Sequence, residues 1–202
     1  GQRDNTIVVF TSDHGDFAFH WGMCKKDLDL VDHMLHVPGI VSWPAQLKPR
    51  TVRADESLAE SIDLFPTLLD LAGIEVPAAV NGKSLKPFLT GESSQHKSLV
   101  YGDICYTDMK NPYPDYESFI SDWEKYHDAK EPHLLRWTAP FNVPGDHNRS
   151  VRTADWKYIW YHDDHEELYH VAEDPEEFFN LAKDPEHAAP LAQMRALLDQ
   201  PR

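Results

Sequence analysis

A short apolar run near the start of the sequence, Ile7 to Thr11, constrains the fold more than any other segment. Its first four residues are apolar and mostly β-branched, without alternation, which is typical of a strand buried on both faces of a parallel sheet. The polar turn 12–16 follows it directly. Because ligands in open α/β sheets bind beyond the carboxyl ends of the strands, the sequence predicts a functional site at this turn.

Two neighbours in that turn, Asp13 and His14, are candidate metal ligands. A carboxylate and an imidazole that converge on one ion suit Mn, Zn or Fe, and they suit Ca²⁺ less well because Ca²⁺ prefers oxygen. Two ligands do not complete a site, so the others are expected from elsewhere. The alternative is a structural turn, in which Asp13 caps a helix and His14 is solvated.

Lys26 follows His14 after a short spacer and forms a Lys-Lys pair with its neighbour. A lysine close to a metal ion would bind an anionic group as a point charge. The alternative is that both lysines are simply exposed to solvent. At the level of single residues, both interpretations stay open.

The rest of the first half contains a second strand and one well-marked helix. Residues 37–44 predict a strand between two prolines. Residues 61–73 have apolar side chains at helical spacing and end in glycine. Because Pro66 is tolerated only in a first turn, we expect this helix to start near Leu64, with Asp63 as its cap. Residues 81–89 predict a turn and a short helical segment.

The second half begins with a change in composition. Residues 107–149 are rich in Pro, Tyr, Trp, Asp and His without a sustained period, and such long loops are usually functional. Their aromatic side chains would either stack on a sugar ring or seal the loop onto the body, and His147 and Arg149 are candidate substrate contacts. A strand at 150–161, a partner strand at 167–171 and a closing helix at 188–199 follow. We therefore expect two parts, an α/β core over 1–90 and an antiparallel subdomain over 91–202.

Composition excludes several classes of protein. Lysine and arginine number 19 against 34 acidic residues, and a formal net charge of −15 argues against binding to nucleic acid. No apolar run approaches the ~20 residues of a membrane span. Two cysteines are too few for a disulfide framework. The sequence enters its first strand without an initiator Met, so we expect a C-terminal part of a larger protein that pairs with its missing part or self-associates.

Taken together, the ordered motifs resemble the sulfatase family of the alkaline phosphatase superfamily. The resemblance covers nearly the whole chain except the loop, and it rests on residues 4–16, 22, 26, 37–44, 61–74, 82–85, 151–159, 167–169, 173–177 and 180–182. It implies an alkaline-phosphatase-like α/β sandwich, of which this chain is the C-terminal part, with a small antiparallel β subdomain and a C-terminal helix. It also implies that Asp13 and His14 bind a divalent metal, usually Ca²⁺ in the family, with Mn or Zn as alternatives. Lys26 would contact the sulfate oxygens.

The sequence also departs from the family pattern. The nucleophile motif, Cys-x-Pro-x-Arg or Ser-x-Pro-x-Arg, whose first residue becomes formylglycine, is absent, and so are the two leading Asp ligands. We therefore expect no catalytic residue in this chain and no activity of the chain alone. Phe19 and Trp21 stand where the family usually has Gly and then His or Tyr, and Phe19 would narrow the approach to the metal. His36 replaces a common Arg.

The resemblance implies hydrolysis of a sulfate ester, on a carbohydrate or another sulfated small molecule, by a protein whose missing N-terminal part supplies formylglycine and the remaining acidic ligands. One alternative is a phosphodiesterase or phosphonate monoester hydrolase of the same superfamily. The other is a non-catalytic fragment or interaction module. The family suggests a periplasmic, secreted or lysosomal protein, and the sequence itself does not specify a compartment.

Overall fold

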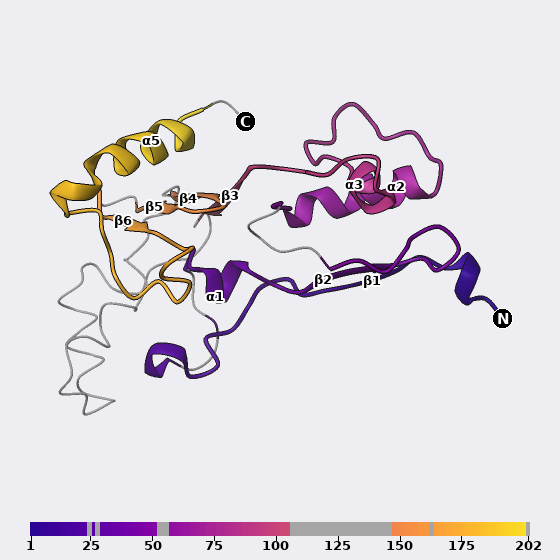
Figure 1. The fold of residues 1–202 in the computed structure, drawn as a ribbon, viewed down its shortest axis with the longest axis horizontal. Coiled ribbons are helices and arrows are strands. Elements are labelled where there is room, and N and C mark those ends of the chain that lie inside the picture. The colour runs from indigo at the N-terminus through magenta and orange to yellow at the C-terminus, as the bar shows by residue number, and fades with distance from the viewer. Residues whose placement is uncertain (24–25, 27–28, 52–56, 106–146, 162–163, 201–202) are drawn as a thin grey trace.

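The computed structural model describes residues 1–23, 26, 29–51, 57–105, 147–161 and 164–200. The predicted loop 107–149 therefore lies outside the described residues, except for its last three. Within the described part, the elements form two antiparallel sheets with helices packed on them, as Figure 1 shows. This mixed α/β arrangement with a C-terminal helix is the expected fold class.

The first sheet joins β1 (Val8–Thr11) to β2 (Gly39–Ser42), as the two apolar runs predict. The expected parallel pairing was wrong, because these strands pair in antiparallel register, with Phe10 opposite Ile40. In this chain Val8, Phe10 and Ile40 are more than half exposed, so burial of both faces of the strand stays a prediction for the whole protein. A continuous apolar run favours a strand that is covered on both faces, but it does not specify the direction of the neighbouring strand.

Helices lie beside this sheet in Figure 1. The 3₁₀ turn η3 (Ser61–Asp63) leads into α2 (Leu64–Leu71), and α3 (Lys86–Thr90) follows, so both predicted helical segments are confirmed. The short elements η1 (Arg3–Asn5), η2 (His20–Gly22) and α1 (Asp32–Leu35) belong to the first third of the chain.

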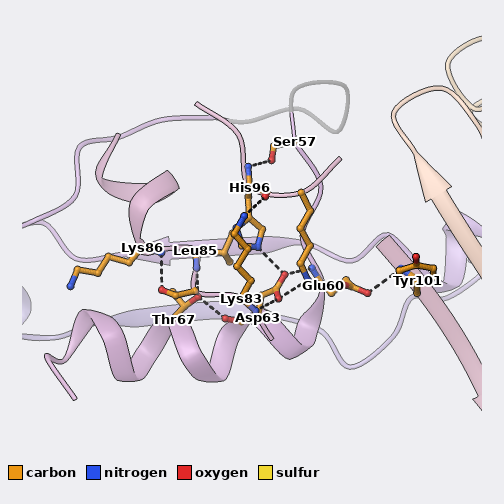
Figure 2. Close-up of polar contacts among 11 residues, drawn as sticks. Ser57, Glu60, Asp63, Thr67, Lys83, Leu85, Lys86, His96 and Tyr101 are labelled. Carbon is orange, nitrogen blue, oxygen red and sulfur yellow. Dashed lines mark hydrogen bonds and ion pairs between the residues drawn. The ribbon is translucent and has the colours of Figure 1, made fainter. Parts of the chain in front are cut away.

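Asp63 has a different role from the predicted helix cap. Its side chain forms no capping bond to α2. The buried carboxylate accepts instead from Lys97 Nζ at 2.8 Å, from the Lys83 backbone N–H at 2.8 Å and from His96 Nε2 at 3.0 Å (Figure 2). Burial would raise the pKa of Asp63, but these donors outweigh burial and hold that pKa below its usual range. The carboxylate thus joins α2 to the segment that leads into the second sheet.

The second sheet has the order β3-β4-β5-β6 and is antiparallel throughout, with β3 (Leu99–Cys105), β4 (His147–Thr153), β5 (Lys157–Trp160) and β6 (Glu166–Tyr169). The single strand expected over 150–161 was wrong. The chain turns between Thr153 and Trp156, where the Thr153 hydroxyl accepts from the Trp156 backbone N–H at 3.0 Å, and such side-chain turns compete with strand extension. The partner strand β6 is confirmed.

Both faces of the second sheet are covered. One face packs against α5 (Ala188–Leu198), which follows η5 (Pro185–His187) and is the predicted closing helix. The opposite face packs against Phe17, Leu30, Val31 and Met34. The α5-side core consists of Val151, Tyr158, Leu168, Leu191, Met194 and Leu198. The other core consists of Phe17, Leu30, Val31, Met34, Ile159, Tyr161, Tyr169 and Val171. The second of these cores combines residues from both predicted parts of the chain. The division of the chain at residue 90 stays a prediction.

Candidate metal centre

The turn after β1 is held in place by its glycine. The Gly15 backbone N–H donates to the Met34 carbonyl oxygen at 2.8 Å, which joins the turn to α1. A Cβ atom at this position would lie 1.8 Å from the His33 carbonyl oxygen, far inside any allowed contact. Only glycine permits this approach, and the approach fixes where Asp13 and His14 lie.

The imidazole of His14 has a defined orientation. Its Nδ1 lies 2.7 Å from the Gly15 carbonyl oxygen. Since a carbonyl can only accept, Nδ1 bears the proton in the neutral ring, and Nε2 presents a lone pair. Lys26 Nζ lies 3.0 Å from that Nε2 and can donate to it. The predicted lysine therefore lies directly beside the predicted metal ligand.

Asp13 completes this cluster. One of its carboxylate oxygens lies 3.6 Å from His14 Nε2, and the other accepts from the His14 backbone N–H at 3.0 Å. That backbone donor, followed by the nearby imidazole of His14, lowers the pKa of the exposed Asp13 carboxyl. Neighbouring ligands of one divalent ion, each bonded at 2.0–2.6 Å, lie roughly 3–4 Å apart. Asp13 and His14 thus fit as two ligands of one cation, and a complete site needs more.

The other two predicted contacts lie elsewhere. Arg149 is on the α5 side of the second sheet, where its guanidinium stacks over the Trp160 ring at 5.0 Å and lies 3.8 Å from Asp199. The structure therefore does not bring Arg149 to the cluster. The backbone of His147 pairs with Cys105 in the sheet, and its side chain lies outside the described part of the structure. Substrate contact by these two residues stays a prediction.

The departures from the family pattern have a structural consequence. Phe19 and Trp21 both adopt left-handed backbone conformations, with φ of 70° and 53°. Phe19 therefore occupies, with a bulky side chain, a conformation that favours the glycine usual at its place in the family. Phe19 is 77% exposed.

Comparison with known proteins shows which family the chain resembles. The family model described as Sulfatase matches residues 1–74. A Δ4,5-hexuronate-2-O-sulfatase from Bacteroides thetaiotaomicron is 38% identical over 197 residues, which is 96% of this chain and 34% of that protein.

Solved structures extend the likeness to the whole described fold. A phosphonate monoester hydrolase from Silicibacter pomeroyi superimposes with a TM-score of 0.72 at 29% identity, over 98% of this chain and 34% of its own. A protein solved with its substrate D-glucosamine-2-N,6-O-disulfate superimposes with a TM-score of 0.71 at 27% identity, over 98% and 34%.

The chain belongs to the sulfatase family of the alkaline phosphatase superfamily. It spans about a third of the length of the relatives just described. Among the described residues, none of the helices has both the length and the apolar character required to cross a bilayer.

Proposed function

We propose that this chain forms part of an enzyme that hydrolyses a sulfate ester on a carbohydrate. The observation that supports this most directly is the convergence of Asp13, His14 and Lys26 on one exposed spot. The family membership and the 38% identity to a hexuronate 2-O-sulfatase support the same chemistry. We take a 2-O-sulfated unsaturated hexuronate as the first substrate to test.

Each residue of the cluster has a distinct role in this proposal. Asp13, with its lowered pKa, and His14, with Nδ1 committed to Gly15, present an anionic oxygen and a nitrogen lone pair to a divalent cation, Ca²⁺, Mn²⁺ or Zn²⁺. When bound, the cation stabilises negative charge on the sulfate oxygens. Lys26 then leaves His14 Nε2 and donates to the sulfate, which orients the ester for cleavage.

The nucleophile and the remaining metal ligands must come from outside this chain. The formylglycine motif and the leading Asp ligands are absent from its sequence. Since the chain spans about a third of its relatives, we propose that another part of the same protein supplies both. The exposed apolar residues of the first sheet, Val8, Phe10 and Ile40, support this, because they would lie against that part.

A kinetic comparison of the full-length protein tests the proposal. Wild type should release sulfate from the unsaturated 2-O-sulfated disaccharide, and Lys26→Ala should lower kcat/KM by about 100- to 1000-fold, as loss of one oxyanion donor does. Lys48→Ala, at an exposed lysine of the loop after β2, should behave as wild type. Unchanged turnover in Lys26→Ala would refute the role assigned to Lys26, and absence of turnover in wild type would favour the non-catalytic alternative.

A second candidate function is hydrolysis of a phosphonate monoester. It is favoured by the equally high TM-score of the phosphonate monoester hydrolase structure. The His14 nitrogen also suits Mn or Zn. A higher kcat/KM on a phenylphosphonate monoester than on any sulfate ester, with Mn or Zn as the bound metal, would assign this function instead.

A further inference from the structure

Two histidines and a glutamate from three separate segments converge outside the site described above. His20 lies in η2, His33 in α1, and Glu176 in the loop after β6. One nitrogen from each ring and one carboxylate oxygen lie within 4.8 Å of one another. Asp13, His14 and Lys26 contribute no atom to this cluster, and the proposed hydrolysis assigns no role to it.

The distances within this cluster suit an ion better than hydrogen bonds. Glu176 Oε2 lies 3.3 Å from His20 Nδ1 and 3.5 Å from His33 Nε2. Both distances exceed the 2.7–3.2 Å of ordinary N–H···O bonds. Two ligands bonded at 2.0–2.2 Å to a tetrahedral zinc ion lie about 3.4 Å apart, which matches both measured values.

The two imidazole rings also have unsatisfied polar atoms. They stack with centroids 3.7 Å apart and planes 15° apart, so that at least one ring is neutral and offers a lone pair. His20 Nε2 and His33 Nδ1 are buried and have no hydrogen-bond partner among the described residues. These are the nitrogens on the other side of each ring from Glu176, so they are not ligand atoms of the cluster and would need partners of their own, such as an ordered water.

The backbone holds the three residues close together. Ala18, Phe19 and Trp21, which flank His20, all have positive φ, at 47°, 70° and 53°. Such strain persists only where the surroundings enforce it, and it gathers at functional sites. Glu177, the neighbour of Glu176, has a φ of 55° and accepts from the Asp32 backbone N–H at 2.8 Å. That bond places Glu176 beside α1 and its His33.

We propose that His20, His33 and Glu176 form a second metal site, which binds a divalent transition-metal ion of the zinc class. Two imidazoles and a carboxylate are a donor set that zinc accepts with a fourth position open to water. The Glu176 side chain is 50% exposed, so that position faces solvent. Because parallel rings point their lone pairs side by side, binding turns the rings out of their stack. The ion then ties η2, α1 and the loop after β6 together.

Titration of Zn²⁺ alone against a chromophoric chelator tests this proposal on the full-length protein. Wild type and His14→Ala should both bind one tight equivalent at this site, which separates it from the Asp13–His14 centre. His33→Gln and Glu176→Gln should weaken that binding by at least about 10- to 100-fold. The control His187→Gln, at the end of η5, should bind as wild type. Equal affinity in wild type and both ligand variants would overturn the proposal, as would the absence of a tight equivalent in wild type.

A spectroscopic measurement guards against misfolded variants. Glu176→Gln preserves the shape of a half-exposed side chain, so its circular dichroism should match that of wild type. Co²⁺ bound to wild type should give the strong visible absorption of a four-coordinate ion, and the folded Glu176→Gln variant should lack it. The same weak, six-coordinate spectrum in both proteins would contradict the site.

Discussion

Asp29 is a carboxyl group whose surroundings disfavour its charged form. Burial, followed by the neighbouring Glu167 carboxylate, raises the pKa of Asp29 to about 7. The Tyr161 hydroxyl lies 3.2 Å from its Oδ1. The folded protein therefore keeps a proton that the unfolded chain has already released near pH 4. The stability that the protonated Asp29 carboxyl contributes is fully present below about pH 4 and is lost as the pH rises through 7.

Asp29→Asn should remove this pH dependence. The variant should be more stable than wild type at pH 8 by about 1–3 kcal/mol, and the difference should vanish toward pH 4. Urea unfolding at both pH values measures it, with Asp155→Asn at an exposed turn as the control. A variant that is less stable than wild type at pH 8 would show that the folded protein stabilises the ionised form of Asp29 instead of disfavouring it.

At the residue scale, the sequence predicts the local site and misses the distant one. Asp13 and His14 are neighbours at the end of a strand, so the pattern alone places their side chains near each other. Lys26 could be added only through the family resemblance. The cluster of His20, His33 and Glu176 depends on contacts between segments more than 140 residues apart in sequence. The high number of histidines, 12 in the chain, was the only indication of this cluster in the sequence.

The turn after β1 and α1 act as one unit, because Gly15 joins them. Gly15→Ala forces a Cβ atom against the His33 carbonyl oxygen and should destabilise the protein by about 1–3 kcal/mol, the usual cost of overpacking. Gly39→Ala in β2 meets no atom within 4 Å and serves as the control. Thermal unfolding of the two variants compares them, and equal melting temperatures would mean that the turn does not press on α1.

The docking of α5 on the second sheet is a further prediction for a single element. Met194 is 1% exposed and lies between α5 and the strands, so Met194→Ala should cost about 2–5 kcal/mol. Gln193→Ala, on the exposed face of the same helix, should change stability by less than about 0.5 kcal/mol. Chemical denaturation measures both, and a small effect at Met194 would show that α5 is loosely packed.

Helices whose apolar residues recur at a regular spacing were predictable from the sequence. Strands and turns that depend on contacts with neighbouring strands or on a single side-chain bond were not. The apolar faces of α2 and α5 follow helical spacing, so both helices were found from the sequence. The strand β3 includes Gly102 and Asp103, residues that are unfavourable in strands, and it was missed. The turn between β4 and β5 depends on a hydroxyl–backbone bond of Thr153, which leaves no mark in the hydrophobic pattern.

At the scale of the whole molecule, the first sheet exposes a shared apolar face. Val8 and Phe10 are two residues apart on β1 and therefore point to the same side of the sheet. Ile40 lies opposite Phe10 on β2 and shares that side. We expect the isolated chain to self-associate through this face. Sedimentation velocity should show oligomers for wild type and monomers for a Phe10→Lys/Ile40→Lys variant.

The control for this prediction is Phe179→Lys, an exposed aromatic residue far along the chain from the first sheet. It should associate like wild type. A monomeric wild-type chain at high concentration would show that the exposed face needs no partner.

The central claim is that Asp13 and His14 jointly bind a cation beside Lys26, and anomalous diffraction from crystals of the full-length protein tests it most directly. We predict one anomalous peak in bonding contact with a carboxylate oxygen of Asp13 and with Nε2 of His14, and Lys26 Nζ displaced from that nitrogen. A cation bound by other residues alone, with Lys26 still 3.0 Å from His14 Nε2, would contradict the claim.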